Sequence, residues 1–331
     1  MNIFVTGGCG FIGSNFIRYA LKKYQNIKII NLDKLTYAGN LNNLKDIAND
    51  KRYKFIKGDI CDNKLIDSIL KSEVRSQKSD IIINFAAETH VDRSIKHAAD
   101  FIKTNIEGTR VLLDAAKKRN IKKFLQISTD EVYGDVPRGL SRETDRLLPR
   151  SPYAASKATA DLLCLSYYQT YGLGVIITRS SNNFGPYQYP EKVMPLFITN
   201  LLAGKKVPLY GDGKNVRDWI YVEDNCVGID AILKKGKLGQ IYNIGGNNQM
   251  RNIDMIKAIL KKLKLGNKYI KYVTDRPGHD RRYALNSNKL NKLGWKPRYS
   301  FYKALALTLD WYKVNQRWWK PLKRQAKIIK W

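Results

Sequence analysis

The sequence predicts an α/β protein, built on a doubly wound parallel sheet with a smaller mixed α/β substrate-binding lobe. In the first half of the chain, short apolar runs of strand length alternate with longer segments of helical periodicity. Such alternation is typical of parallel sheets covered by helices on both faces, and right-handed crossovers make these sheets doubly wound. The 331 residues, of which 44% are hydrophobic, suffice for a large core.

The elements of this sheet follow one another in regular order. Strands are expected at residues 2–6, 27–32, 54–57, 81–86, 124–128 and 175–179. Helices are expected at residues 13–23, 65–71, 98–119 and 151–171. Beyond residue 180 the pattern changes, because glycine, proline and asparagine cluster in several short stretches. We therefore expect a first domain over residues 1–180, to which later segments return, and a discontinuous smaller lobe over residues 181–331.

A glycine-rich turn joins the first expected strand to the first expected helix. Gly7 permits a tight turn, Gly10 lets the backbone approach a pyrophosphate, and Gly13 lets the helix pack closely on the sheet. The free N–H groups and the dipole of the helix N-terminus then favour phosphate, next to Phe11 and Ile12. The turn predicts that residues 1–180 form a Rossmann-type dinucleotide-binding domain.

The second expected strand is followed by an acidic residue that selects the cofactor. Asp33 lies about twenty residues beyond the last glycine, where a carboxylate accepts hydrogen bonds from the adenosine ribose hydroxyls. The same carboxylate would repel the 2′-phosphate of NADP. We therefore expect NAD as the cofactor, although Lys34 could in principle tolerate a phosphate.

Tyr153 and Lys157 are one turn apart on an expected helix, so their side chains are neighbours. A free tyrosine is a poor base near neutral pH, because its pKa is about 10. A nearby ammonium and a positively charged nicotinamide both favour the phenolate, which makes Tyr153 a candidate base for a sugar hydroxyl. Together with the glycine turn, this pair resembles the extended short-chain dehydrogenase/reductase family, in which Ser128 and Thr129 match the position of the catalytic hydroxyl.

Two adjacent acids, Asp130 and Glu131, follow directly at the carboxyl end of an expected strand. Doubly wound sheets bind their ligands at this edge. Once C4 of a glucose is oxidised, a carboxylate can remove the acidified C5 hydrogen while a carboxylic acid protonates the C6 hydroxyl. Mutual repulsion and unequal burial can give two neighbouring carboxyl groups different pKa values, so that one acts as the acid and the other as the base.

Eight motifs along nearly the whole chain resemble the dTDP-glucose 4,6-dehydratase family. They lie at residues 6–13, 33–40, 86–92, 128–134, 153–157, 180–188, 216–222 and 275–282. The resemblance implies NAD-dependent formation of a 4-keto-6-deoxy sugar nucleotide, with C4 oxidation, loss of water from C5 and C6, and hydride return to C6. It also implies a role in dTDP-rhamnose or other deoxysugar synthesis, and a homodimer that pairs the helices at 98–119 and 151–171.

The resemblance implies a role for each matching residue. Thr129 would bind the substrate near O4, Asp130 would act as the acid for water loss, and Glu131 as the base at C5. The remaining cofactor contacts would be Leu35, Thr36, Asp59, Ile60, Ala86, Ala87, Thr104 and Asn183. The substrate contacts would be Thr89, Asn182, Lys192, Pro208, Tyr210, Arg217, Asn252, Arg276 and His279. Arginine suits a diphosphate, because its planar fork is always charged.

Other functions remain open from the residues alone. UDP-glucose or CDP-glucose could replace dTDP-glucose, since thymine and uracil differ by one methyl group. A nucleotide-sugar 4-epimerase would share the fold, NAD and the Tyr153–Lys157 pair, but would not need the acid pair. A basic nucleic-acid-binding protein on a Rossmann scaffold would need none of these catalytic groups.

Composition adds further expectations. The net charge of +30 arises from lysines spread over the whole chain, so we expect a solvated basic surface and no nucleic-acid partner. Four distant cysteines and three histidines lack metal-ligand spacing, so neither a metal site nor a disulfide framework is expected. The sequence shows neither a signal peptide nor an apolar run of membrane-spanning length, which predicts a cytoplasmic protein without membrane contact.

Overall fold

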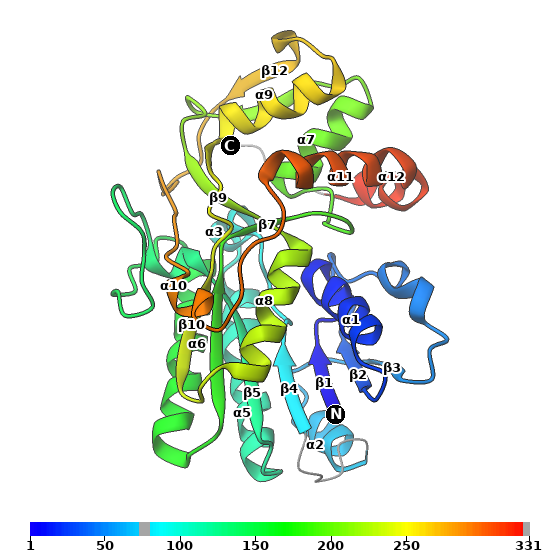
Figure 1. Ribbon diagram of the computed structural model, residues 1–331, viewed down its shortest axis with the longest axis vertical. Coiled ribbons are helices and arrows are strands. Elements are labelled where there is room, and N and C mark those ends of the chain that lie inside the picture. The colour runs from blue at the N-terminus through cyan, green and yellow to red at the C-terminus, as the bar shows by residue number, and fades with distance from the viewer. Residues whose placement is uncertain (73–79, 327–331) are drawn as a thin grey trace.

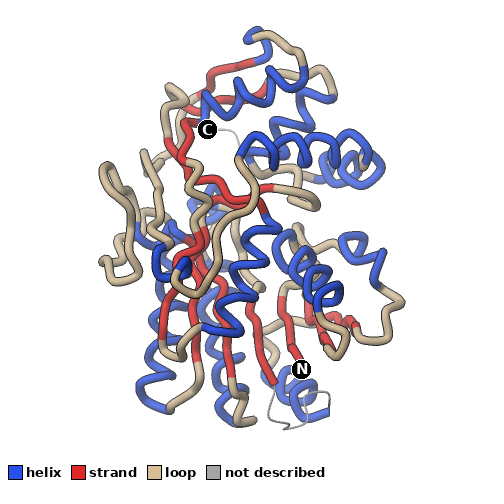
Figure 2. Tube along the Cα trace, in the orientation of Figure 1, coloured by secondary structure: helices blue, strands red, loops and turns tan. Residues whose placement is uncertain are grey.

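The computed structural model describes residues 1–72 and 80–326. Its larger part is a seven-stranded parallel sheet with the strand order β10-β6-β5-β4-β1-β2-β3 (Figures 1 and 2). The strands are β1 (Asn2–Thr6), β2 (Lys28–Asp33), β3 (Tyr53–Lys57), β4 (Asp80–Asn84), β5 (Lys123–Thr129), β6 (Val175–Ser180) and β10 (Gln240–Ile244). This sheet, together with a smaller lobe of mixed sheets and helices, confirms the predicted fold class.

Each face of the large sheet carries its own apolar cluster, because successive side chains of a strand point to opposite faces. Ile3 and Val5 of β1 face α1 (Phe11–Lys23) and α8 (Val222–Lys235). Phe4, between them, faces α2 (Asn63–Ser72), α5 (Gly108–Lys118) and α6 (Pro152–Tyr171). The strands therefore read as continuous apolar runs rather than as alternating patterns.

The sequence-based boundaries of the first six strands agree with the structure to within two residues. The long helix expected at 98–119 is present as a continuous helical run over residues 99–118, but it is not regular throughout. The chain instead forms α4 (Ala99–Phe101), a π-helical segment η2 (Ile102–Glu107) and then α5. The wider turn carries the side chain of Asn105, which is 1% exposed, to the backbone of Glu88 and to the hydroxyl of Ser156. Periodicity cannot reveal this irregularity, because its cause lies in two other elements.

The smaller lobe is assembled from the second half of the chain. A three-stranded sheet joins β7 (Asn182–Phe184), β9 (Val216–Tyr221) and β11 (Gln249–Arg251), and β8 (Val207–Tyr210) pairs with β12 (Ile270–Val273). Its helices are α7 (Val193–Leu202), α9 (Asn252–Leu263), α11 (Phe301–Val314) and α12 (Gln316–Gln325). They pack around a third apolar cluster that includes Trp219 and Phe301. Because β10 pairs with β6, the second half also contributes to the large sheet, and the exact division at residue 180 stays a prediction.

Short elements complete the fold. They are η1 (Leu41–Ile47), α3 (Val91–Lys96), η3 (Asp130–Tyr133), η4 (Asn267–Tyr269) and α10 (Asn288–Asn291). All four cysteines carry free thiols. Across the described ranges, no helix combines the length and apolar character needed to cross a membrane.

Candidate active site

The glycine-rich turn lies at the carboxyl end of β1, where the strand order reverses between β1 and β4. Gly7 has a φ of +70°, and a Cβ there would lie 2.5 Å from the backbone nitrogen of Ala86. A Cβ at Gly13 would lie 2.6 Å from the carbonyl oxygen of Gly7. Both positions therefore require glycine, and the backbone forms a cradle of the kind that accepts a pyrophosphate.

Asp33 ends β2 and is held in a fixed orientation. Its two carboxylate oxygens accept hydrogen bonds from the backbone N–H groups of Cys9 and Leu35, each at 2.8 Å. Burial raises the pKa of this carboxyl, and the two N–H groups oppose that rise. The ammonium of Lys34 lies 2.7 Å from the carboxylate of Asp59, which already balances its charge. The arrangement fits a ribose with free hydroxyls better than one with a 2′-phosphate.

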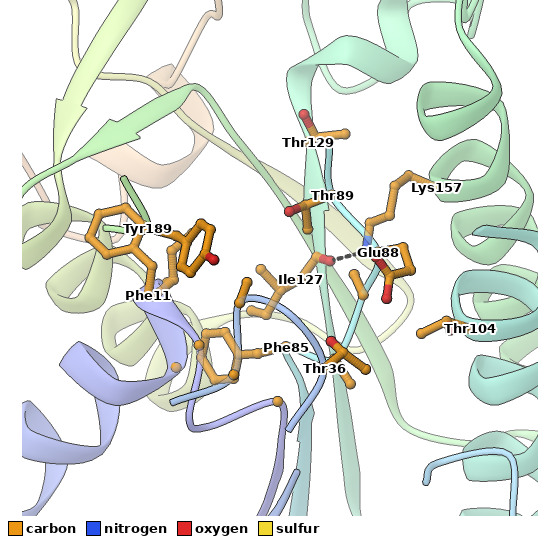
Figure 3. A pocket seen from close by; sticks show the side chains of 18 of the residues that line it. Phe11, Thr36, Phe85, Glu88, Thr89, Thr104, Ile127, Thr129, Lys157 and Tyr189 are labelled. Atoms are coloured by element: carbon orange, nitrogen blue, oxygen red, sulfur yellow. Dashed lines mark hydrogen bonds between the residues drawn. The ribbon is translucent and has the colours of Figure 1, made fainter. Parts of the chain in front are cut away.

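A cavity of about 310 Å³ extends from this turn along the carboxyl ends of the strands (Figure 3). It brings together most of the residues predicted from the sequence. Those at the cofactor end are Gly7, Gly10, Phe11, Ile12, Gly13, Asp33, Lys34, Thr36, Asp59, Ile60, Ala86, Ala87, Thr104 and Asn183. Those at the reacting end are Thr89, Thr129, Asp130, Glu131, Tyr153, Lys157, Asn182 and Lys192. Leu35 does not line the cavity: its side chain packs against the apolar cluster that contains Ile3 and Val5, and its backbone N–H donates to Asp33.

The acid pair is positioned by a local cap. Thr129 ends β5, and its hydroxyl accepts a hydrogen bond from the backbone N–H of Glu131 at 3.2 Å. This N-cap begins η3 directly after the strand, so both carboxyl groups reach the cavity wall. The Thr129 hydroxyl also donates to Asp130 Oδ1 at 3.3 Å, and it opposes the rise in the pKa of the neighbouring Tyr153 phenol. One threonine thus connects three candidate catalytic groups.

The surroundings of the two acids differ. Burial raises the pKa of Asp130 well above its usual value, and the neighbouring carboxylates of Glu131 and Asp218 add to the rise. Burial also raises the pKa of Glu131, but Arg276, Arg217 and Lys192 oppose the rise. When the pair holds one proton, these surroundings favour Asp130 as the neutral group and Glu131 as the charged group.

Tyr153 and Lys157 project from the first turns of α6, whose N-cap is Ser151. Burial raises the pKa of Tyr153, and the Glu131 carboxylate raises it further. The Lys157 ammonium donates to the carbonyl of Ile127 at 2.6 Å, as the dashed line in Figure 3 marks. Burial lowers the pKa of Lys157, whereas Asp161, one turn further along α6, raises it.

The other predicted substrate residues form an outer cluster around Asp92 of α3. Its two carboxylate oxygens accept hydrogen bonds from Arg276 at 3.0 Å and from the Tyr210 hydroxyl at 3.3 Å. His279 packs edge-on against the Tyr210 ring, and burial lowers its pKa to about 4. Arg217 stacks over the ring of Tyr283 at 4.3 Å. The cluster adjoins the cavity through Glu131, on which both arginines act.

The last three predicted contacts have distinct positions. Lys192 precedes α7, and its ammonium donates to the backbone carbonyl of Thr89 at 2.7 Å. Pro208 lies in β8, paired with Lys271 of β12. Asn252 begins α9, and its side-chain oxygen is buried without a hydrogen-bond partner among the described residues.

Sequence reasoning missed several residues that contribute to the site. Glu88 and Tyr189 line the cavity, and Asp92 organises the outer cluster. Asp161 is fully buried and forms an ion pair with Arg179 at 2.9 Å. Some had a readable signal, since Glu88 and Asp92 lie in the 86–92 motif and Asp161 follows Lys157 by one turn. The other missed cavity residues are Leu32, Ala38, Gly39, Gly58, Phe85, Ile127, Ser180, Ser181 and Gln188.

The cradle and its neighbours fit a dinucleotide. Besides the glycine turn and Asp33, the side-chain oxygen of Asn183 is buried beside the cavity without a hydrogen-bond partner in the described part of the chain. Together, the fold and this constellation define a nicotinamide-dependent enzyme of the extended short-chain dehydrogenase/reductase class.

Comparisons with known proteins narrow that class. Residues 4–308 match the family model described as GDP-mannose 4,6 dehydratase. A dTDP-glucose 4,6-dehydratase from Streptomyces niveus is 47% identical over 328 residues, covering 98% of this chain and 96% of that protein. The chain therefore belongs to the dTDP-glucose 4,6-dehydratase family.

Solved structures agree with this assignment. A dTDP-glucose 4,6-dehydratase from Bacillus anthracis str. Ames, in complex with NAD, is 51% identical with a TM-score of 0.91, covering 97% of this chain and 99% of that one. The dTDP-glucose 4,6-dehydratase from Streptomyces venezuelae, also with NAD bound, is 46% identical with a TM-score of 0.93. The match covers 97% of this chain and 100% of that one. A UDP-glucose 4-epimerase from Thermus thermophilus, also with NAD, is less similar, at 29% identity and a TM-score of 0.87, covering 95% and 100%.

Proposed function

We propose that this protein dehydrates dTDP-glucose to dTDP-4-keto-6-deoxyglucose with NAD as its cofactor. The observation that carries the proposal is the adjacent Asp130–Glu131 pair, whose surroundings favour different protonation states, directly beside Tyr153 and the dinucleotide cradle. A reaction that only oxidises and reduces C4 has no use for both carboxyl groups, whereas loss of water from C5 and C6 needs an acid and a base.

The first step requires a base at the C4 hydroxyl. The residues around the glycine turn and Asp33 would hold NAD, which would supply an acceptor for the C4 hydride and a donor for its return to C6. Tyr153 removes the hydroxyl proton, and Thr129 holds O4 through its hydroxyl. Burial raises the pKa of Tyr153, so the cations of the assembled site must offset it, and Lys157 supplies one of them.

The elimination is assigned to the acid pair. Glu131, whose charged form Arg276, Arg217 and Lys192 favour against the effect of burial, removes the proton from C5. Asp130, which burial keeps neutral, gives its proton to the departing C6 hydroxyl, so one water leaves. For the return of hydrogen, Glu131 gives its proton back to C5.

The two ends of the site divide the ligands between them. We assign the cofactor to the cavity-lining residues near the glycine turn, with Asp33 at the adenosine ribose and Asp59 and Ile60 at the adenine. The cations Lys192, Arg217 and Arg276 suit the diphosphate. Asn182 and Thr89 lie toward the sugar, and Pro208, Tyr210, Asn252 and His279 toward the nucleoside.

The decisive experiment is to incubate the purified protein, without added NAD, with dTDP-glucose, UDP-glucose and CDP-glucose in parallel. Mass spectrometry should show loss of one water from dTDP-glucose, which would establish dehydration, a resident cofactor and the base preference together. An unchanged mass for all three substrates, even after NAD is added, would overturn the proposal. An altered sugar of unchanged mass would indicate a 4-epimerase.

We further infer that two copies of the chain associate through α6 and the segment before α5. Three large apolar side chains are more than half exposed there, namely Ile102, Leu162 and Tyr171. A stable dimer would cover such a surface. Leu162→Glu should convert the dimer to a monomer in light scattering, whereas Val314→Glu, an exposed apolar residue on α11, should not. A monomeric unmodified protein would contradict this inference.

We also place the protein in the cytoplasm. Its four free cysteines, three of them buried, suit a reducing compartment. Fractionation of the source cells, followed by immunodetection, tests this assignment.

A further inference from the structure

The C-terminal helix α12 lies against the amino-terminal part of the chain, above α1 in Figure 1. The contact is a hydrogen bond of 2.9 Å, which the indole N–H of Trp318 donates to the side-chain oxygen of Asn43 in η1. The two residues are 275 positions apart in the sequence. No role in the reaction described above accounts for this contact.

Asn43 in turn holds the glycine-rich turn. Its side-chain N–H₂ donates to the carbonyl oxygen of Cys9 at 2.8 Å, and Asn43 is only 1% exposed. The same carbonyl accepts the backbone N–H of Asn40 at 3.1 Å, and the N–H of Cys9 donates to Asp33. The Cys9 peptide, in the middle of the cofactor cradle, is thus held from both sides.

The direction of these bonds gives Trp318 a specific effect. An asparagine amide has an accepting oxygen on one side and a donating nitrogen on the other, whereas an indole N–H can only donate. Trp318 therefore turns the Asn43 oxygen toward itself, which directs the Asn43 nitrogen to Cys9. The Cys9 carbonyl can only accept, so it favours the same orientation, and without the indole donor it is the one remaining partner that selects it.

The aromatic cluster around Trp318 fixes the indole. Its ring lies edge-on to Trp311 at 5.0 Å and to Tyr187 at 5.7 Å. The guanidinium of Arg18, in α1, stacks over the ring of Tyr187 at 4.0 Å from the ring centre. It also donates a hydrogen bond to the backbone carbonyl of Asn43. The cluster thus joins α11, α12 and α1 around Asn43.

We propose that Trp318 is a positioning residue for the dinucleotide, which acts through Asn43 to hold the Cys9 peptide of the glycine turn. Its function is to retain NAD between turnovers. The inference rests on the proposed function only through the identity of the cofactor. It is therefore tested on NAD content and NAD release, which can be measured whether or not the protein dehydrates a sugar.

The central test compares Trp318→Phe with Trp311→Phe. Both variants keep an aromatic ring in the same cluster, but only the first loses a hydrogen bond in the chain from Trp318 to Cys9. NAD released by denaturation after gel filtration is quantified by chromatography, and its dissociation rate is followed by fluorescence. Trp318→Phe should release NAD about tenfold faster, as expected for one buried hydrogen bond. Trp311→Phe should retain NAD like the unmodified protein.

A second variant keeps the proposal testable if Trp318→Phe does not fold. Asn43→Asp preserves the shape and the acceptor for Trp318, but places an oxygen against the Cys9 carbonyl, so it should also lose NAD. Adding Trp318→Phe to Asn43→Asp should then cause little further loss. Added NAD should restore bound cofactor in both variants, which a misfolded protein would not allow. Unchanged NAD retention in Asn43→Asp and in folded Trp318→Phe, or equal loss in Trp311→Phe, would overturn the proposal.

Discussion

At the scale of single residues, the site depends on how differently two neighbouring carboxyl groups are surrounded. Asp130 is 3% exposed and faces two further carboxylates, so its neutral form is favoured. Glu131 faces three cations, which stabilise its charged form against burial. The assignment of acid and base therefore follows from long-range partners, since the two residues are adjacent in the chain.

The first prediction concerns Glu131→Gln. The amide cannot remove the C5 proton, so sugar oxidation should still occur while product formation falls by about 10²–10⁴-fold. Absorbance of reduced cofactor should then accumulate when dTDP-glucose is added, and mass spectrometry should detect almost no dehydrated product. Glu223→Gln, at an exposed ion pair with Arg298, serves as the control and should keep full activity. Full product formation by the Glu131 variant would exclude this role.

The pH profile provides the second prediction. Activity requires a charged Glu131 and a neutral Asp130, so kcat should fall at low pH as Glu131 gains a proton and at high pH as Asp130 loses one. Lys192 lowers the pKa of Glu131, so its removal in Lys192→Gln should raise that pKa. The acidic limb of the kcat profile, measured at saturating substrate, should then move to higher pH. The control Lys234→Gln should leave the limb in place, and an unmoved limb in both variants would argue against the assignment.

At the scale of elements, the π-helical segment η2 joins the cofactor side of the site to the catalytic helix. Asn105 accepts from the Glu88 N–H at 2.9 Å and donates to the Glu88 carbonyl at 3.0 Å and to Ser156 Oγ at 2.8 Å. Ser156 in turn donates to the carbonyl of Tyr153. The irregular turn thus fixes the position of α6 relative to the loop after β4.

The third prediction follows from this connection. Asn105→Ala leaves buried polar groups of Glu88 and Ser156 without their partner, which costs roughly 1–3 kcal/mol for each buried group that stays unsatisfied. The melting temperature measured by circular dichroism should fall by at least a few degrees. The control is Thr159→Ala, which removes an exposed hydroxyl from α6 and should cost far less. Equal melting temperatures for Asn105→Ala and the unmodified protein would show that the hydrogen bonds of Asn105 do not stabilise the fold.

At the scale of the whole molecule, the chain has a net charge of +30, and its substrate, a sugar nucleotide, is an anion. Long-range attraction raises association rates for such a substrate, and dissolved salt screens it. The Debye length shortens from about 30 Å at 0.01 M salt to about 8 Å at 0.15 M. The basic surface should therefore act on substrate capture rather than on the chemical steps.

The fourth prediction separates capture from chemistry. As sodium chloride rises from about 0.01 M to about 0.5 M, kcat/KM for dTDP-glucose should fall several-fold, because screening weakens attraction. In the same series, kcat should change little, since the acid pair and its cations lie inside the protein. Stopped-flow and steady-state assays measure both constants. A salt-independent kcat/KM would mean that the charge has no part in capture.

Features that depend on neighbours in the chain were predictable from the sequence. The glycine turn and the Tyr153–Lys157 spacing arise from contacts within a few residues, which motif spacing records. The buried strands pair with distant strands, but each is marked in the sequence by its own apolar run. The cavity therefore contains most of the residues predicted for the cofactor, and the acid pair was predicted from its place at the carboxyl end of a strand. The homodimer and the individual residue roles stay predictions.

Features that depend on distant parts of the chain were decided only by the tertiary structure. Arg276 reaches Asp92 across 184 positions, and Trp318 reaches Asn43 across 275. Within the π-helical turn, Asn105 likewise finds its partners in the loop after β4 and in α6. No local pattern encodes such contacts, because their free energy is gained only when the packing of both lobes brings the partners together. The sequence by itself predicted the NAD cofactor and, through its motifs, the family, whereas the packing decides how differently the two acids are surrounded and which groups contact the glycine turn.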